Sequence, residues 1–360
     1  MNFVYKLRAQ AFPLSLVLLL SCSLDPSVHR SGRIDPDSLR SPGEHHLSKI
    51  TQLTFGGENA EAYFSFDDTR LVFQSTRDSF RCDQIYTMKL DGSDVRLLST
   101  GKGRTTCAYF YPDGMRVLYS STHLAGSECL APPDRSRGYV WALYKSFDIF
   151  LADLSGNILQ QLTFAEGYDA EATISPRGDK IVFTSMRDGD LELYSMDLDG
   201  SNIQRLTRTR GYDGGAFYSF DGRKIVYRAF HPTSEEAVRV YEELLKDGLI
   251  RPTRLEIFVM DADGRNIIQV TDNGAANFAP FFHPDGQRII FSSNMNDPKR
   301  RNFDLFIIKT SGTDLEQVTF NETFDSFPMF SRDGKKLVFA SNRNARKHGE
   351  TNIFIADWDE

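Results

Sequence analysis

Residues 172–207 read ATISPRGDKIVFTSMRDGDLELYSMDLDGSNIQRLT and form one complete copy of a unit that recurs along the chain. The segment holds four short runs rich in β-branched and apolar residues, separated by turn residues, which is the pattern of four strands. Asp199-Gly200 stands between the last two runs and is typical of a tight hairpin turn. Four strands joined in this way make one blade of a β-propeller.

The unit occurs six times. Every copy is marked by a Leu-Thr-like pair, and the pairs are Leu53-Thr54, Leu98-Ser99, Leu162-Thr163, Leu206-Thr207, Val270-Thr271 and Val318-Thr319. Successive pairs are 45, 64, 44, 64 and 48 residues apart. A period of about 40–50 residues with several short strands is typical of propellers. We therefore predict an all-β fold, a six-bladed β-propeller of four-stranded blades, over residues 45–360.

The two ends of the repeat region are complementary. The last copy stops after its third strand, at residues 353–357, and a spare strand at residues 47–53 precedes the first copy. We expect the spare strand to serve as the fourth strand of the last blade. This pairing would close the ring and cover a strand edge that would otherwise be open.

The repeats resemble those of the TolB-type propeller family. A Phe-Ser-Pro-Asp-Gly-like turn, an Ile-Val-Phe-x-Ser-x-Arg strand and an Ile-Tyr-x-Met-Asp-x-Asp-Gly-like hairpin carry the resemblance, which extends over about residues 45–357. The family includes partner-binding periplasmic proteins and non-catalytic propellers attached to peptidases, so the resemblance implies a binding function. The two-layer α/β domain that precedes the propeller in TolB itself is not recognisable in this sequence.

The N-terminal segment has the layout of a secretion signal. Lys6 and Arg8 precede an apolar run that is too short to span a membrane, and Ser21-Cys22 follows it. The residues up to Cys22 resemble a bacterial lipobox, which implies cleavage before Cys22 and lipidation of that cysteine. The alternative is an ordinary signal peptide with an incidental cysteine. We expect a lipoprotein signal peptide at residues 1–21 and a flexible tether at residues 22–44, which are rich in Ser, Pro, Asp and Arg.

These features predict an exported protein, anchored by lipid in the cell envelope. Ser23 after the lipidated cysteine implies the outer membrane, with the propeller facing the periplasm. The formal net charge of -7 gives no basic footprint for nucleic acid. The expected partners are therefore the membrane, through the lipid anchor, and a protein or glycan of the envelope, and the propeller is expected to be monomeric.

Two insertions lengthen the repeats, at about residues 123–146 in blade two and at about residues 230–254 in blade four. Both fall between the second and third strands of a blade, so both belong to one rim, which is commonly the binding face of a repeat protein. The second insertion is predicted to contain a helix, with Thr233 and Glu236 as a capping box. The helix is expected to pack on the rim, to form a lid or a docking site for a partner, or to do both.

The first insertion carries several aromatic residues, namely Tyr139, Trp141, Tyr144 and Phe147. They could form a stacking surface for a ligand or fasten the loop to the domain. Three cysteines, Cys82, Cys107 and Cys129, are expected on the same face. We predict one disulfide among them, with Cys82–Cys129 slightly favoured. Unpaired thiols, or a metal site that also uses His123, are the alternatives.

Alignment of the six innermost strands predicts a ring of side chains at the channel mouth. One level consists of Asn59, Thr105, Asp169, Asp213, Asn277 and Asp325, and the level two residues further in consists of Glu61, Cys107, Glu171, Gly215, Ala279 and Phe327. The carboxylates and amides of both levels are the predicted binding site, which comprises Asn59, Glu61, Asp169, Glu171, Asp213, Asn277 and Asp325.

No organic cofactor is indicated, but clustered carboxylates suit a hard cation. Calcium or another divalent cation could bind at Asp169, Glu171, Asp213 and Asp325, and a cationic group of a partner could bind there instead. The alternative is that these polar residues face a water-filled tunnel and cap backbone N–H groups.

The sequence contains no Gly-x-Ser-x-Gly elbow, no His-Glu-x-x-His motif and no phosphate-binding glycine loop. We therefore predict a non-catalytic, membrane-anchored binding or scaffold propeller of the envelope that engages a protein or a small ligand at its channel mouth. The alternative is a propeller enzyme, a polysaccharide lyase or lactonase-like hydrolase, that uses a metal in the central channel. The absence of histidine from the aligned ring favours the binding protein.

Overall fold

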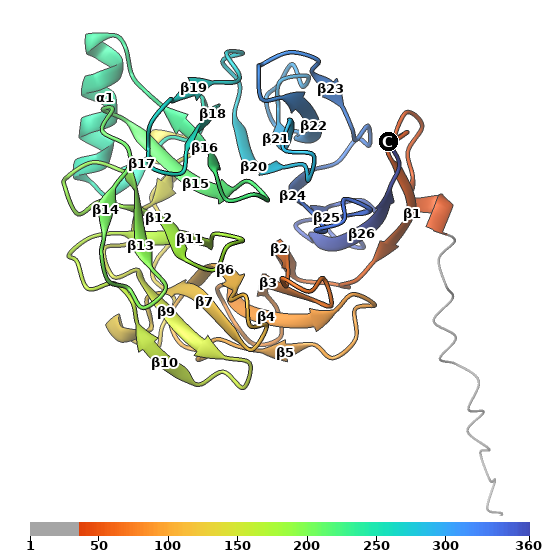
Figure 1. The fold of residues 1–360 in the computed structure, drawn as a ribbon, viewed down its shortest axis with the longest axis horizontal. Coiled ribbons are helices and arrows are strands. Elements are labelled where there is room, and N and C mark those ends of the chain that lie inside the picture. Colours follow the sequence, from red (N-terminus) through yellow and green to blue (C-terminus); the bar gives the residue numbers. More distant parts are fainter. Residues whose placement is uncertain (1–35) are drawn as a thin grey trace, which may run out of the picture. The chain divides into compact units, whose positions relative to one another are not determined.

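The computed structural model describes residues 36–360, and in this region six four-stranded sheets stand around a central axis (Figure 1). Each sheet runs from an inner strand near the axis to an outer strand at the rim. This arrangement confirms the six-bladed propeller that the repeats predict. None of the helices in this part of the chain has the length and apolar character needed to cross a membrane.

The strands of blades one to three follow one another from the axis outward. Blade one consists of β2 (Glu58–Phe64), β3 (Arg70–Thr76), β4 (Gln84–Lys89) and β5 (Arg96–Leu97). Blade two consists of β6 (Thr105–Phe110), β7 (Arg116–Ser121), β9 (Asp148–Asp153) and β10 (Ile158–Gln161). Blade three consists of β11 (Asp169–Ile174), β12 (Lys180–Ser185), β13 (Glu192–Asp197) and β14 (Gln204–Arg205).

Blades four and five have the same order, and the last blade combines both ends of the folded region. Blade four consists of β15 (Tyr212–Tyr218), β16 (Lys224–Phe230), β18 (Glu256–Asp261) and β19 (Ile268–Gln269). Blade five consists of β20 (Asn277–Phe282), β21 (Arg288–Ser293), β22 (Asp304–Lys309) and β23 (Glu316–Gln317). Blade six consists of β24 (Asp325–Phe330), β25 (Lys336–Ser341), β26 (Asn352–Trp358) and β1 (Leu47–Gln52).

The predicted ring closure is confirmed. Strand β1 pairs antiparallel with β26, with Leu47 opposite Trp358 and Gln52 opposite Phe354. Leu47 and Ile50 are 0% and 1% exposed, so the strand contributes to the core as well as to the hydrogen-bonded ladder.

The second strand of every blade is apolar on both faces because each blade packs between two others. In β3, for example, Leu71, Val72 and Phe73 are all fully buried. Full burial of such a side chain contributes about 1.5–3 kcal/mol. These strands are therefore marked by continuous apolar runs rather than by alternation.

Residues 36–44 belong to the folded region, which corrects the predicted end of the tether at residue 44. A 3-10 helix, η1, covers Pro36–Leu39, and the side chain of Glu44 is fully buried. Glu44 accepts hydrogen bonds from the Arg343 guanidinium at 3.0 and 3.1 Å. The predicted signal peptide, the lipidation site Cys22 and most of the predicted tether lie outside the described residues.

The two insertions lie between β7 and β9 and between β16 and β18, as predicted. They contain η2 (His123–Ala125), η3 (Arg135–Arg137), β8 (Trp141–Ala142), α1 (Glu235–Lys246) and β17 (Leu249–Ile250). Strand β8 pairs antiparallel with β17, with Trp141 opposite Ile250. The insertions of blades two and four thus form one joint layer, which the sequence did not indicate.

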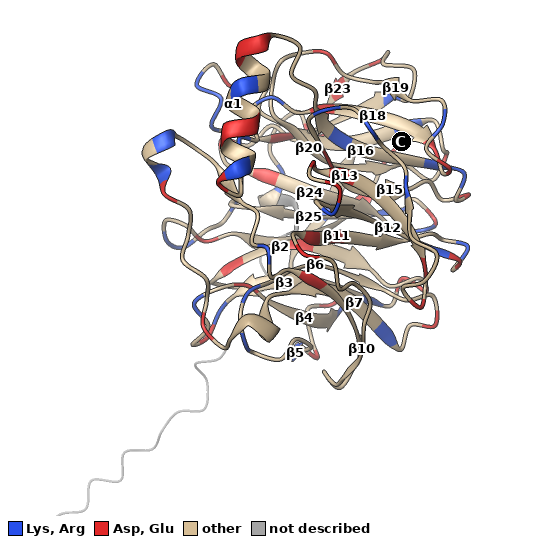
Figure 2. Cartoon of the chain, turned by 90° about the vertical axis from the view of Figure 1, so that its left-hand side faces the viewer, with Lys and Arg blue, Asp and Glu red and all other residues tan. Residues whose placement is uncertain are grey.

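Helix α1 lies on the outside of this layer, and acidic and basic residues alternate along it (Figure 2). Its cap is one residue later than predicted, because the side chain of Ser234, not Thr233, accepts a hydrogen bond from the N–H of Ala237. Tyr241 and Leu244 are buried, and the Tyr241 hydroxyl donates a hydrogen bond to Asp190 of blade three. The helix is therefore packed on the rim.

Candidate binding site in the central channel

The first predicted level of the ring joins each blade to the blade before it. Its six residues are the first or second residues of the inner strands, and all are 0–1% exposed. Each donates its backbone N–H, at 2.8–3.1 Å, to the carbonyl that directly precedes the third strand of the preceding blade. In the last blade, for example, Asp325 N–H donates to the Phe303 carbonyl at 2.8 Å. The backbone of this level therefore links neighbouring blades.

Each carboxylate of this level pairs with a basic side chain of its own blade, an arginine or a histidine. The partner follows the second strand and extends back toward the start of the inner strand. The pairs are Arg187–Asp169 at 3.2 Å, His231–Asp213 at 2.8 Å and Arg343–Asp325 at 3.1 Å. Burial raises the pKa of all three carboxyls, and the arginine or histidine paired with each carboxyl opposes that shift.

The predicted divalent cation site required carboxylates that are clustered and unpaired, and these carboxylates are paired. Across residues 36–360, no group of three or more His, Cys, Asp or Glu side chains is placed to hold a metal ion. Asp169, Glu171, Asp213 and Asp325 therefore do not form a shared ligand set. Each of these carboxylates is instead paired with an arginine or a histidine.

The second predicted level is different, because its six residues all line one cavity. Each inner strand has a β-bulge here, and the bulged residue has a φ of 51–59°. A bulge re-aims a side chain, and the six bulged residues line a small chamber of about 30 Å³. The lining residues are Glu61, Cys107, Glu171, Gly215, Ala279 and Phe327, together with Tyr63, Ala172, Thr173, Phe217 and Arg228.

Arg228 also lines the chamber, although the alignment of the inner strands does not indicate it. It comes from β16, is buried, and donates hydrogen bonds to the Glu171 carboxylate and to the Tyr212 hydroxyl. Gly215 makes room for it, because a Cβ at this position would lie 2.1 Å from Arg228 Nη1. An arginine inside an apolar second strand, together with Gly214-Gly215 in the facing inner strand, was the available signal.

The Glu61 carboxyl is strongly perturbed by its surroundings in the chamber. Its carboxylate oxygen Oε2 is buried and has no hydrogen-bond partner among the described residues. Burial raises the pKa of Glu61 to about 7, and the nearby Glu171 and Asp83 carboxylates add to the shift, whereas the Cys107 thiol and Arg228 oppose it. Burial and the two glutamates also raise the pKa of Cys107 well above its usual value, so this cysteine remains a neutral thiol.

The channel is not an open tunnel, because aromatic rings cross it beneath the chamber. Tyr63 and Phe217 line the chamber, and their ring centroids are 5.3 Å apart. They contact Tyr109 and Phe281, which line a second cavity of about 30 Å³ on the other side of the rings. The two cavities are therefore separated, and none of the predicted site residues lines the second one.

The joint layer of the insertions reaches the chamber. The ring of Trp141 in β8 lies 5.4 Å from the Arg228 guanidinium, and Tyr212 stacks on the same guanidinium at 5.7 Å. Leu143 and Phe147 of the same insertion are buried among residues of blades three to five, whereas Tyr139 is 56% exposed. The aromatic residues of the first insertion thus fasten it to the domain and bring Trp141 to the channel.

The sequence profile of the TolB beta propeller domain matches residues 124–244 and 256–360, which is more than half of the chain. The chain belongs to this family. A protein TolB homolog from Chlorobium luteolum is 26% identical in an alignment of 187 positions that covers 46% of this chain and 40% of the relative. The match thus spans less than half of that relative, so its whole activity does not transfer to this TolB-type propeller.

Solved structures with the same fold include two described as TolB. A putative TolB from Agrobacterium tumefaciens has a TM-score of 0.56 at 17% identity, and the match covers 86% of this chain and 97% of that one. TolB from Acinetobacter baumannii has a TM-score of 0.54 at 19% identity, with 85% of this chain and 64% of that one covered. At these identities the likeness shows the propeller fold.

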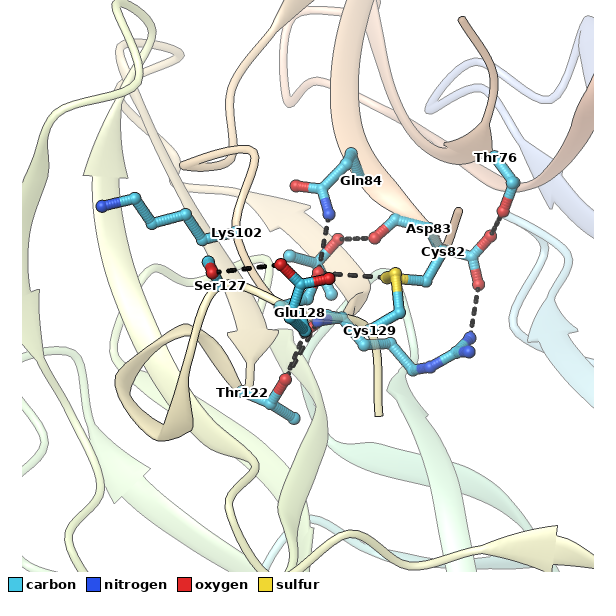
Figure 3. Close-up of a disulfide and its surroundings, with 12 residues drawn as sticks. Thr76, Cys82, Asp83, Gln84, Lys102, Thr122, Ser127, Glu128 and Cys129 are labelled. Atoms are coloured by element: carbon cyan, nitrogen blue, oxygen red, sulfur yellow. Dashed lines mark hydrogen bonds and ion pairs between the residues drawn. A yellow bond between two sulfur atoms is a disulfide. The ribbon is translucent and has the colours of Figure 1, made fainter. Parts of the chain in front are cut away.

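A disulfide joins the first insertion of this TolB-type propeller to blade one (Figure 3). Cys82 precedes β4 and pairs with Cys129, with the two Cα atoms 5.9 Å apart. Gln84 donates a hydrogen bond to the Gly103 carbonyl beside it at 2.9 Å. The predicted pairing is confirmed, and Cys107 is the free thiol of the described region.

In three blades the third strand begins with a buried or half-buried acidic residue. These residues make the stability of the protein depend on pH. Burial raises the pKa of Asp148 to about 6 and those of Glu192 and Asp304 to about 7. A neighbouring carboxylate of the first ring level adds to each shift. The folded state binds the protons of these three carboxyls more tightly than the unfolded state does. Their contribution to the free energy of unfolding is therefore largest at low pH and is lost as the pH rises from about 4 to about 7.

We expect the urea midpoint of unfolding to fall between pH 5 and pH 8. Asp304→Asn should flatten this profile and raise the midpoint at pH 8, because Asp304 Oδ1 is buried without a partner among the described residues. Glu322→Gln, at an exposed position, is the control and should keep the wild-type slope. Unfolding curves followed by circular dichroism test this, and an unchanged slope in Asp304→Asn would contradict it.

Proposed function

We propose that this TolB-type propeller is a non-catalytic binding protein of the cell envelope, and that it engages a protein or a small ligand at the chamber end of its channel. The observation that carries the proposal is the chamber itself. Residues from all six blades wall it, and the layer built from the two insertions contacts Arg228 in this wall through Trp141. A concave site with few polar groups and apolar walls is typical of ligand binding.

The composition of the chamber supports binding over the alternative lyase or hydrolase. Its ionisable groups are Glu61, Tyr63, Cys107, Glu171 and Arg228, and no histidine lines it. Glu171 is already bound to Arg228, and the raised pKa of Cys107 disfavours a thiolate nucleophile. The pKa of the Glu61 carboxyl there is raised to about 7, but the described part of the chamber holds no second unpaired carboxylate or histidine to act with it as an acid–base pair.

The proposal is tested by site-specific photo-crosslinking in cells. A benzophenone amino acid replaces Tyr139, which is 56% exposed in the first insertion, or Met115, which is 70% exposed in the β6–β7 turn on the opposite rim. We expect a crosslinked adduct from position 139 and none from position 115. Equal crosslinking from both positions, or saturable turnover of a glycan or an ester, would contradict the proposal.

We further propose that the protein is exported and anchored by a lipid on Cys22, in the outer membrane and facing the periplasm. The lipobox-like sequence before Cys22 supports this, and so does the disulfide, because disulfides persist in oxidising compartments. Cys22→Ala is expected to abolish labelling by a fatty acid and to release the protein from the membrane fraction. Cys107→Ala is the control and should label normally; a wild type that takes up no label refutes the anchor.

A further inference from the structure

The positive and negative charges inside the chamber nearly cancel, but the negative charge of Glu61 has no positive partner of its own among the described residues. Arg228 neutralises Glu171 through their direct ion pair. Cys107 is a neutral thiol and Thr173 is uncharged. When Glu61 is ionised, the chamber therefore carries one uncompensated negative charge, on a group that the six blades enclose.

The same group has an unused hydrogen-bond acceptor. The Cys107 thiol hydrogen-bonds to the Glu61 carboxyl, but the buried oxygen Oε2 has no partner among residues 36–360. A buried carboxylate oxygen without a donor is costly, and native structures rarely keep one without a reason. The chamber thus favours an occupant that brings a charged donor to this oxygen.

The remaining walls favour an organic cation over a metal ion. Tyr63, Phe217 and Phe327 line the chamber, and the faces of aromatic rings attract cations. Ala172 and Ala279 add apolar surface for an alkyl stem. Calcium takes about six to eight oxygen ligands, whereas the chamber offers one carboxylate that is not already bound to an arginine.

We propose that the chamber takes a single monocationic group, an alkylammonium or a guanidinium, which donates a hydrogen bond to Glu61 Oε2 and packs against the aromatic walls. The inference rests on the proposed function and narrows its ligand to one chemical class. Such a group can come from a free amine or from a Lys or Arg side chain of a protein partner. The chemistry at Glu61 is the same for both.

Isothermal titration calorimetry on the whole protein tests the ligand class. The probes are n-butylammonium chloride, methylguanidinium chloride and calcium chloride, at pH 8, where Glu61 is ionised. The variants are Glu61→Gln, which keeps the shape of the side chain and removes its charge, and Glu58→Gln as a control at an exposed position of the same strand. The raised pKa of Glu61 shows that burial favours a neutral group there, so Glu61→Gln is expected to fold.

We expect both organic cations to bind the wild type and Glu58→Gln with similar affinity, and Glu61→Gln to bind at least about tenfold more weakly. A tripeptide Gly-Lys-Gly that binds more tightly than n-butylammonium identifies a partner side chain as the source, and the reverse order identifies a free amine. Calcium binding that depends on Glu61 without amine binding, equal amine affinity in Glu61→Gln, or no binding of any probe overturns the inference.

The proposed function has a separate readout. Crosslinking from position 139 that persists in Glu61→Gln, combined with no amine binding, would retain the binding function and overturn only the ligand class. Loss of the crosslink from the wild type itself would instead remove the proposed function.

Discussion

A chain that begins at Thr54 is expected not to form a stable monomeric propeller. Removal of β1 strips the fourth strand from blade six and leaves β26 as an open edge. It also removes Leu47, Ile50 and Leu53, which are at most 4% exposed. At about 1.5–3 kcal/mol for each buried side chain, their loss approaches the whole stability of a typical domain, about 5–15 kcal/mol.

Urea unfolding and size-exclusion chromatography measure this effect. A chain that begins at residue 36 is the control and should unfold cooperatively, as the longer protein does. The chain that begins at Thr54 is expected to aggregate or to elute as an expanded species. A cooperative transition at the control's urea midpoint would show that the ring does not depend on β1.

The fold could be predicted because the repeat is local and occurs six times. Each blade carries its own turn residues and its own apolar second strand, such as Leu71 to Phe73, so each copy confirms the others. Closure by β1 followed from counting strands. The pairing of β8 with β17 could not be predicted, because two-residue strands in separate insertions leave no periodic pattern in the sequence.

The site was predicted only in part, for two physical reasons. Alignment of the inner strands placed Glu61 and Glu171 at one level, but the bulge that turns them into the chamber requires a positive φ at non-glycine residues, which composition does not report. The partner cations of the outer level were readable in the repeated Ser-x-Arg at Ser185 to Arg187 and at Ser341 to Arg343. These arginines bind the carboxylates of Asp169 and Asp325, so a position near the channel does not by itself leave a carboxylate free to bind a ligand.

The amino-acid composition of the segment before β1 did not predict that Glu44 would be buried in the folded region. The segment before β1 is polar and was therefore predicted to be a tether. However, Glu44 binds Arg343, which lies 299 residues away in the sequence, and Arg343 also binds Asp325. A segment that is polar throughout can thus be fixed by one buried ion pair, so a chain that begins at residue 45 is expected to be less stable than one that begins at residue 36.

Arg343→Met is expected to lower the free energy of unfolding by about 3–5 kcal/mol, because it leaves buried charge without a partner. The Arg343 side chain is 5% exposed, and those of Glu44 and Asp325 are 0% exposed. Arg77→Met is the matched control, since Arg77 occupies the same place in blade one but bonds the neutral Asn59. Urea unfolding should show a clearly smaller loss for the control.

The two variants should also differ in their response to pH. In the wild type, Arg343 opposes the rise that burial causes in the pKa of Asp325. Without Arg343 that pKa rises further, so the folded variant binds a proton that the unfolded chain releases. The loss of stability in Arg343→Met should therefore be larger at pH 8 than at pH 5, while the loss in Arg77→Met should be nearly independent of pH. Equal losses at both pH values in Arg343→Met would mean that lost packing, rather than uncompensated charge, causes the destabilisation.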